Sequence, residues 1–505
     1  MMFHLPVLAG AVVLAFGAVF GENTLSVTQP PSLRDMFSFQ NVQGAIEERP
    51  SLFGEPAYGR SMRGRLHLPP DNNLNGCSPM AFQENKDQLV FLLQRGNCTF
   101  TTKVRNAQDA GASAVIVVNY EDKVPTHMSI DGSDSATSAI SIPSMIIKKT
   151  DGQKLTNHIQ LNKDDPVQVS IEYGLSKTDI VNLDIWTSSM DPQSGGFADL
   201  GDLLAPLQEQ GKLAVNLHYV FVDGTTYQCE TGTQLCGNQC TNNGRYCAVD
   251  PDRDLSLGVS GADVVQENLR RICLSQYANE HKDYKLPWTY AKGFAEKCAS
   301  DKKVNKECSK SVLESIKSGL YDSVQQCFDK SGGADPASSQ VNSLIESEIK
   351  LKEESNVYLV PSFAFNKAPY YGTTTCRGPL SLDTCPLGKT LCNAYNENSI
   401  PNICRTSPGC SLGQVRDACN QCMDPASKDF ISDKGNCVIR GGGVSVGTVI
   451  ALIVVFVAIL IGAAFVYHQH SAVKMRNELR SIMSQYVPLE GDGNSVVDSE
   501  QTRLV

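Results

Sequence analysis

Hydrophobic and polar positions in the first third of the chain change period repeatedly, which predicts strands separated by helices. Residues 88–93 and 113–119 are short runs dominated by Val, Leu and Ile, and residues 100–110 between them place apolar side chains at helical spacing. A strand, a crossover helix and a second strand form a βαβ unit with parallel strands. We therefore expect an α/β domain over residues 22–174. A further strand is predicted at 140–147 and a further helix at 150–159.

A second succession of strands and helices begins near residue 184 and predicts another α/β domain. Its order is strand, helix, strand, a long insertion, then helix, strand, Pro361 and strand. This is the order of a thioredoxin-like fold, in which that proline is usually cis. We expect such a fold over residues 175–375, with a cis Val360–Pro361 bond. The strands are predicted at 184–187, 214–222, 357–360 and 362–365, and the helices at 197–210 and 339–352.

Two longer apolar runs predict segments outside the folded domains. Residues 5–20 are too few for a comfortable span and end in small residues, which is typical of a signal peptide over residues 1–21. Residues 444–467 contain 24 consecutive uncharged positions, which is enough for a transmembrane helix. Because basic residues flank both ends of that run, the signal peptide decides the orientation, and we expect residues 468–505 in the cytosol.

The 18 cysteines all lie between Cys77 and Cys437, on the side of the span that we assign to the lumen. An oxidising lumen explains this distribution. Two cysteines come early, eight lie within 229–327 and eight within 376–437, so each group can close its own disulfides. Eight cysteines allow on the order of 100 connectivities, which leaves the pairing open. We expect a helical Cys-rich insertion at about 229–330 and a small Cys-rich module at 376–440.

The net charge and the length of the chain limit the classes of function to consider, but they do not identify one. The chain has 505 residues, of which 44 are Lys or Arg and 54 are Asp or Glu, giving a net charge of −10. This mild acidity gives no reason to expect a nucleic-acid partner. The length allows several domains, each with its own core.

The residue patterns needed for common catalytic sites are missing or misplaced. A thioredoxin-like oxidoreductase needs Cys-x-x-Cys at its first helix, whereas residues 188–193 read SSMDPQ. The Gly-x-Ser-x-Gly match at 443–447 stands at the mouth of the predicted span, where no strand-turn-helix elbow can form. No His is followed by Glu, so a His-Glu-x-x-His zinc site is absent. We expect a protein that is not an enzyme.

Residues 250–254, DPDRD, begin like a calcium-binding loop. Leu255 at the sixth position and Gly261 at the twelfth replace the Gly and Glu that an EF-hand requires. An EF-hand is therefore excluded, and we assign no metal ligand. Loose coordination of calcium by these carboxylates stays open as the one candidate cofactor. The alternative is a solvated loop in which an Asp caps a helix.

The turn between the first predicted strand and helix carries a specific resemblance. It reads RGNCTF at 95–100 and is followed by an Ala-Gly-Ala sequence and an Ala-Val-Ile-Val strand, which resembles a protease-associated domain. GAI at 44–46 and GEPAYG at 54–59 resemble the same domain in the vacuolar sorting receptors of plants and algae. Such domains are non-catalytic modules that bind peptides or proteins.

The resemblance implies a cargo site on this turn. Arg95 offers a planar fork of donors suited to peptide carbonyls or carboxylates, and Gly96 permits close backbone approach. The alternative is that Arg95 pairs with a neighbouring Asp or Glu and only shapes the loop. The expected cargo-binding residues are Arg95, Gly96, Asn97 and Phe100.

The family match also places Cys77 and Cys98 beside the turn, and we expect a disulfide between these two cysteines, the only ones of the domain. Asn97 begins an Asn-Cys-Thr sequon and is therefore a predicted glycosylation site. A glycan at Asn97 would obstruct cargo, so the two predictions for this residue compete.

The central region strengthens the resemblance. CTNNGRYCAVDP at 240–251 and GADVVQENLR at 261–270 are very similar to the central region of vacuolar sorting receptors. Those receptors carry epidermal-growth-factor-like repeats where this chain has residues 376–440. This chain is shorter there and lacks their calcium signature, so an EGF-like module is expected without assigned calcium ligands.

The segment RSIMSQYVPLE at 480–490 looks like the cytosolic tail of the same receptors. It contains a Tyr-x-x-hydrophobic signal, in which Tyr486 and Leu489 are expected to enter pockets of a clathrin adaptor medium subunit. A receptor-like ubiquitin ligase also joins a protease-associated domain to one span, but the tail has no Cys for a zinc-binding RING.

These features imply a vacuolar or lysosomal-type sorting receptor. It would be a single-pass type I glycoprotein that binds peptide signals on soluble vacuolar hydrolase precursors. Its expected route is the Golgi and trans-Golgi network, clathrin-coated vesicles and a prevacuolar or endosomal compartment. A non-enzymatic cell-surface or endosomal receptor for adhesion or signalling stays open as the alternative, and a lumenal oxidoreductase is disfavoured by the missing thiols.

Overall fold

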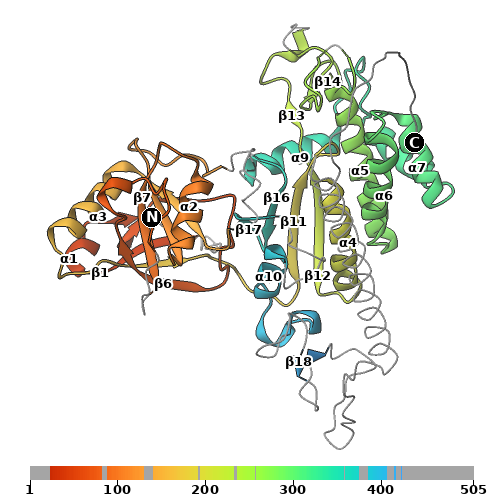
Figure 1. Cartoon of the computed structure of the whole chain (residues 1–505). Coiled ribbons are helices and arrows are strands. Elements are labelled where there is room, and N and C mark those ends of the chain that lie inside the picture. Colours follow the sequence, from red (N-terminus) through yellow and green to blue (C-terminus); the bar gives the residue numbers. More distant parts are fainter. Residues whose placement is uncertain are drawn as a thin grey trace, which may run out of the picture. The chain divides into compact units, whose positions relative to one another are not determined.

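The computed structural model describes residues 23–81, 88–129, 140–191, 194–231, 236–255, 257–355, 357, 359–374, 385–405, 415–416 and 422–423. Two α/β domains and a helical insertion are built from these residues (Figure 1). None of the described helices is both long and apolar enough to cross a membrane. The predicted span at 444–467 and the tail after it lie outside the described residues.

The first domain is built on one eight-stranded sheet. Its strands are β1 (Thr24–Gln29), β4 (Ala45–Ile46), β5 (Glu48–Pro50), β6 (Ser61–His67), β7 (Leu89–Gln94), β8 (Ala114–Val118), β9 (Ser144–Ile147) and β10 (Gln168–Glu172), and its helices are α1 (Pro31–Arg34), α2 (Phe100–Asp109) and α3 (Lys149–Leu161). The strand order is β4-β1-β10-β6-β7-β8-β9-β5, with a small hairpin of β2 (Ser38–Phe39) and β3 (Val42–Gln43) beside it. Strands β6 to β9 are parallel, so the predicted βαβ unit is present as β7, α2 and β8.

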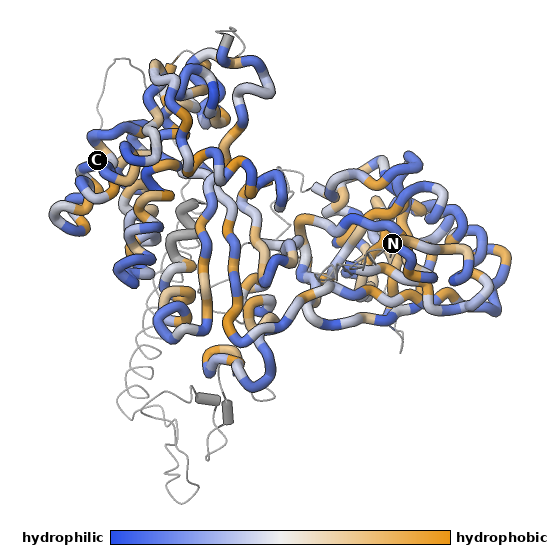
Figure 2. The backbone as a smooth tube through the Cα atoms, turned by 180° about the vertical axis from the view of Figure 1, so that it is seen from behind, coloured by the Kyte–Doolittle hydropathy of each residue, from blue (hydrophilic) through white to orange (hydrophobic). Residues whose placement is uncertain are grey.

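Both faces of β7 are buried, which explains its unbroken apolar sequence. Alternate residues belong to two separate clusters. Phe91 packs in the cluster that contains Val104 of α2, and Leu92 belongs to the cluster that contains Leu155 of α3. Hydrophobic residues are accordingly concentrated on the strands (Figure 2). The sheet thus holds rigidly the strand end from which the candidate turn begins.

The second domain has the predicted thioredoxin-like order. Its elements are β11 (Val181–Thr187), α4 (Ser194–Glu209), β12 (Leu213–Tyr219), α9 (Ser343–Glu354), β16 (Ser362–Phe365), β17 (Ala368–Tyr370) and α10 (Pro386–Asn393). The sheet order is β12-β11-β16-β17, with β11 parallel to β12 and the other neighbours antiparallel. The Val360–Pro361 bond is cis, as predicted.

The strand predicted at 357–360 is wrong. Helix α9 continues to Glu354, and the described residues 357, 359 and 360 form no strand. The chain instead passes through the cis bond before Pro361 into β16, whose neighbours are β11 and β17. Leu359 and Val360 are exposed, so their apolar character comes from a surface turn and not from a buried strand.

A helical insertion lies between β12 and α9. It contains a small sheet of β13 (Val222–Asp223), β14 (Cys240–Thr241) and β15 (Tyr246–Cys247), the helices α5 (Gly261–His281), α6 (Leu286–Phe294), α7 (Lys306–Ile316) and α8 (Leu320–Lys330), and a π-helical turn at Ala295–Ala299. The eight cysteines of this region pair among themselves, as Cys229–Cys236, Cys240–Cys247, Cys273–Cys327 and Cys298–Cys308. Two of these disulfides close the hairpin region and two join helical segments, while apolar side chains of both parts pack in one separate core that includes α5.

The expected boundary at residue 376 stays a prediction, but the packing of the helix after it is described. Helix α10 lies inside the predicted Cys-rich module, yet its Leu387 and Leu391 line an apolar cavity together with Leu183 of β11 and Phe363 of β16. The helix therefore completes the thioredoxin-like core. The Cys392–Cys404 disulfide closes the loop after it. Beyond residue 405, only the short strands β18 (Val415–Arg416) and β19 (Cys422–Met423) are described, and the EGF-like module stays a prediction.

Candidate functional site

Arg95 lies at the carboxyl edge of the parallel strands of the first domain. It directly follows β7, and its backbone N–H donates to the carbonyl of Val118, the last residue of β8, at 2.9 Å. Asn119 is the next residue after β8, and its Oδ1 accepts a hydrogen bond from Arg95 Nη1 at 3.0 Å. The two side chains meet because β7 and β8 are parallel neighbours whose ends share one edge of the sheet.

The Arg95 guanidinium group lies against two aromatic rings. Its Cζ is 4.6 Å from the centroid of Tyr120 and 5.5 Å from that of Phe100, both within cation–π range. Tyr120 is 58% exposed, so its ring forms an accessible wall beside the charge. None of the ion pairs in the described part of the chain includes Arg95. Arg95 therefore has no carboxylate partner among the described residues, and both interpretations of its role stay predictions.

The turn after Arg95 has a backbone that only certain residues adopt easily. Gly96 has a φ of 110° and Asn97 a φ of 68°, and glycine and asparagine tolerate this left-handed region best. The Cys98 N–H donates back to the Gly96 carbonyl at 2.9 Å. Cys98 is joined to Cys77 by a disulfide with a Cα–Cα distance of 5.7 Å. The turn is thus closed by a covalent bond two residues after Gly96.

Asn97 is exposed at the tip of this turn. The hydroxyl of Thr99, the last residue of the sequon, caps α2 by accepting a hydrogen bond from the Thr102 N–H at 3.1 Å. Glycosylation of Asn97 and cargo contacts by Gly96, Asn97 and Phe100 stay predictions.

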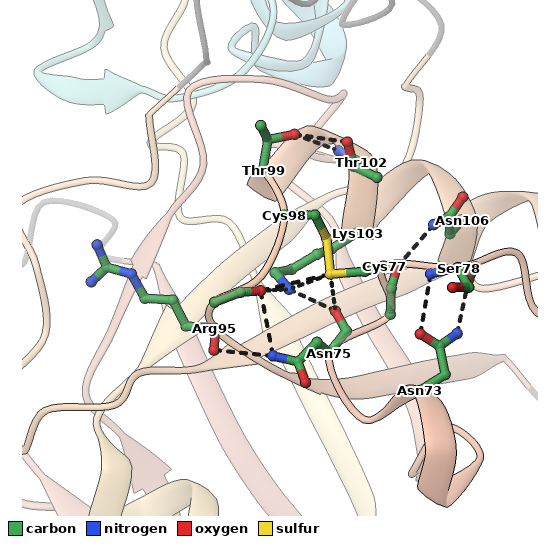
Figure 3. Close-up of a disulfide and its surroundings, with 12 residues drawn as sticks. Asn73, Asn75, Cys77, Ser78, Arg95, Cys98, Thr99, Thr102, Lys103 and Asn106 are labelled. Atoms are coloured by element: carbon green, nitrogen blue, oxygen red, sulfur yellow. Dashed lines mark hydrogen bonds between the residues drawn. A yellow bond between two sulfur atoms is a disulfide. The ribbon is translucent and has the colours of Figure 1, made fainter.

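Four residues around the turn are ones that the sequence patterns do not single out, and Figure 3 shows two of them, Asn75 and Lys103, beneath its backbone. Asn75 and Lys103 contact the backbone of the turn, while Asn119 and Tyr120 contact the Arg95 side chain. One signal was available for Lys103, because it lies three residues after Phe100, on the apolar face of the helix. The other three depend on which loops the strand order brings together, which local periodicity does not reveal.

The position of a thioredoxin active site is occupied by residues 188–191, which carry no thiol. The Ser189 N–H donates to Asn268 Oδ1 at 2.8 Å, and Asn268 Nδ2 donates to the Val220 carbonyl at 3.2 Å. Both Ser189 and Asn268 are buried. Helix α5 of the insertion therefore packs against this segment, which has no group for disulfide exchange.

The calcium-like loop uses its carboxylates to hold its own backbone. Asp250 Oδ1 accepts from the N–H groups of Asp252 and Arg253, at 3.0 and 2.9 Å, and Asp252 Oδ1 accepts from the Asp254 N–H at 3.1 Å. Ser260 and Asp263 then form a capping box at the start of α5. This geometry matches the alternative of a solvated loop leading into a capped helix, and calcium binding stays a prediction.

Comparisons with known families agree with this division into domains. Residues 62–155 match the PA domain, and residues 181–380 match the vacuolar sorting receptor thioredoxin-like domain. The chain is 31% identical to vacuolar-sorting receptor 1 of Pisum sativum over 76% of its own length and 61% of that receptor. It is also 31% identical to vacuolar-sorting receptor 3 of Arabidopsis thaliana, over 80% of its length and 63% of the relative.

The chain thus spans somewhat less than two thirds of the length of these curated relatives. A shorter match, 38% identical, links 14% of the chain to 23% of RING finger protein 148 of Mus musculus.

Proposed function

The chain belongs, over its PA and thioredoxin-like domains, to the vacuolar-sorting receptor family, and we propose that it binds peptide sorting signals on soluble cargo in the Golgi or secretory lumen. The cargo class is soluble vacuolar hydrolase precursors. The receptor then carries its cargo toward a prevacuolar or endosomal compartment. The alternative, an adhesion or signalling receptor, has no specific support from the described residues or from these relatives.

The geometry around Arg95 is the observation that supports this proposal most directly. A guanidinium group held by Asn119 and two aromatic rings, with no carboxylate partner among the described residues, keeps donors available for a ligand. A peptide carbonyl or carboxylate would accept from the guanidinium, and an apolar peptide side chain would lie on Tyr120. Gly96, Asn97 and Phe100 are proposed as the neighbouring contacts.

We assign the thioredoxin-like domain and its insertion a non-catalytic, scaffolding role. The segment at 188–191 lacks thiols, and the cysteines of the insertion are joined in disulfides. No redox chemistry is needed for a receptor that binds and releases a peptide.

The proposal includes a type I topology with residues 444–467 as the span and a tail that recruits a clathrin adaptor through Tyr486 and Leu489. Tyr486→Ala should shift the protein from endosomal compartments toward the cell surface and abolish adaptor binding to the tail, because an aromatic anchor leaves its pocket. Immunolocalisation together with a pull-down on the adaptor medium subunit measures both effects. An unchanged distribution with unchanged adaptor binding would remove the tail from the proposal.

Arg95→Ala tests the cargo site. The full chain in detergent, its Arg95→Ala variant and a control variant Arg63→Ala are immobilised and exposed to the same soluble secretory fraction. Arg63 is an exposed arginine of β6 in the same domain. We expect Arg95→Ala to lose about 2 kcal/mol of binding, roughly a 30-fold loss of affinity, while Arg63→Ala retains binding. Equal capture by all three proteins would refute the role of Arg95.

A further inference from the structure

A buried lysine lies directly under the turn that carries Arg95 (Figure 3). Lys103 of α2 is 0% exposed, and its Nζ donates to the carbonyls of Gly96 and Asn75, at 2.6 and 2.7 Å. The same nitrogen lies 3.4 Å from the Cys77 sulfur. No described ion pair includes Lys103, so its charge is met by backbone carbonyls and not by a carboxylate.

Asn75 and the Cys77–Cys98 disulfide hold the same turn that Lys103 contacts. Asn75 Nδ2 donates to the carbonyls of Arg95 and Gly96, at 3.3 and 3.4 Å. The Cys77–Cys98 disulfide joins the same two segments two residues further on. In Figure 3 the Arg95 side chain extends away from this set of contacts. The backbone of the turn is thus held on one side, and the guanidinium is presented on the other.

We propose that Lys103 is a positioning residue for Arg95, whose ammonium group holds the Gly96 carbonyl against the segment of Asn75 and so fixes the direction in which Arg95 points. This inference rests on the proposed cargo-binding role of Arg95 and adds the residue that orients it.

The disulfide cannot do this alone. It fixes Cys98, whereas the orientation of Arg95 also depends on the two peptide units that flank Gly96. The carbonyls of these units, those of Arg95 and Gly96, accept from Asn75 and Lys103. Gly96 and Asn97 are both in the left-handed region, so a turn without these donors has other conformations available. Hydrogen bonds from a charged donor are about twice as strong as those from a neutral one, and they are strongest where water is excluded.

The protonation state of Lys103 changes within an accessible pH range, which makes the proposal testable. Burial lowers the pKa of Lys103 to about 8. The ammonium form is therefore present in neutral and acidic solution and is lost as the pH rises through about 8. A neutral amine still donates hydrogen bonds, but without the charge that strengthens them.

The experiment compares the full chain with three variants, Lys103→Met, Arg95→Ala and Lys163→Met. Lys163→Met is the matched control, because Lys163 is an exposed lysine of the same domain. Two quantities are measured between pH 6 and pH 9. One is the protection factor of the Cys98 amide, which donates to the Gly96 carbonyl, relative to the amides of β7 and β8. The other is the amount retained from a fixed pool of synthetic decapeptides.

We expect Lys103→Met to lower the protection of the Cys98 amide by about tenfold and peptide retention to the level of Arg95→Ala, while β7 and β8 stay protected. In the unmodified chain both quantities should fall as the pH rises from 7 to 9, and in Lys103→Met both should be flat. Lys163→Met should behave as the unmodified chain.

Three results would overturn the proposal. The first is unchanged protection of the Cys98 amide in Lys103→Met, and the second is loss of protection throughout β7 and β8 in that variant. The third is Cys98 protection and peptide retention that do not change with pH in the unmodified chain. This third result refutes the proposal even if the variant does not fold. If Arg95→Ala retains as much peptide as the unmodified chain, the proposed function fails instead. The Cys98 amide then still reports separately whether Lys103 holds the turn.

Discussion

Glu48→Gln should stabilise the first domain at neutral pH. Glu48 lies on β5, opposite Ile147 of β9, and is almost fully buried. Its Oε2 has no hydrogen-bond partner in the described structure. Burial and, after it, the nearby charge of Glu48 raise the pKa of Tyr173. Burial raises the pKa of Glu48 from 4.5 to about 7, an effect that the positive charge of Arg49 only partly offsets.

The sign follows from linkage between protonation and folding. Because the folded-state pKa is raised for an acid, ionisation of Glu48 costs no stability below pH 4.5, an increasing amount between pH 4.5 and 7, and its full value above pH 7. The difference between 4.5 and about 7 corresponds to roughly 3 kcal/mol. Glutamine has the same shape without the charge, so it should recover up to this amount at pH 8 and almost nothing at pH 4.

Amide hydrogen exchange of β5 and β9 in the full chain measures the effect locally, which suits a protein of several domains. The two proteins should exchange alike at pH 4, and protection in Glu48→Gln should exceed that of the unmodified chain increasingly toward pH 8. Exchange that changes with pH identically in both proteins would mean that Glu48 does not carry a buried charge.

Two further predictions concern the thioredoxin-like domain. Although burial alone would lower the pKa of His218, its contacts with Asp184 and Glu348 raise it to about 9. His218→Gln should therefore lower the free energy of unfolding by up to about 3 kcal/mol below pH 6.5, and this difference should vanish as the pH rises through 9. Urea unfolding of both proteins at pH 6 and pH 10 measures it. An equal difference at the two pH values would contradict the prediction. A Cβ at Gly201 of α4 would lie 2.3 Å from Cγ of Trp288 on α6, so Gly201→Ala should destabilise the domain by about 1–3 kcal/mol. Asp202 is exposed, and Asp202→Ala should leave the stability unchanged. Thermal unfolding of both variants measures the difference.

Local order was predictable where the signal was local. The β7–α2–β8 unit follows from its change of period, and the turn at Arg95 follows from its place between strand and helix. The cis bond before Pro361 was likewise predictable from the order of elements. The false strand at 357–360 shows the limit of this reasoning, because a short apolar run reads alike in a buried strand and in an exposed turn.

What could not be predicted depends on long-range register. Asn119 reaches Arg95 only because β8 lies beside β7, and Asn75 reaches Gly96 across 21 residues of sequence. The burial of Lys103 is hard to predict for a different reason. Lysine is almost never fully buried, so its place on the apolar face of α2 reads as an interruption of the pattern. A buried lysine is stable there because the two carbonyls beneath the turn accept from it.

The position that corresponds to a thioredoxin active site is also unsuited to redox chemistry because of its burial. An attacking cysteine needs solvent access and a helix N-terminus or a positive charge to form its thiolate. At the corresponding position Ser189 is only 2% exposed, and Asn268 from the insertion binds its N–H. Two cysteines introduced at 188 and 191 would therefore lie under α5, away from any substrate disulfide. Helix α5 of the insertion therefore makes this end of the fold a packing surface, because Asn268 bridges the segment of Ser189 and the carbonyl of Val220.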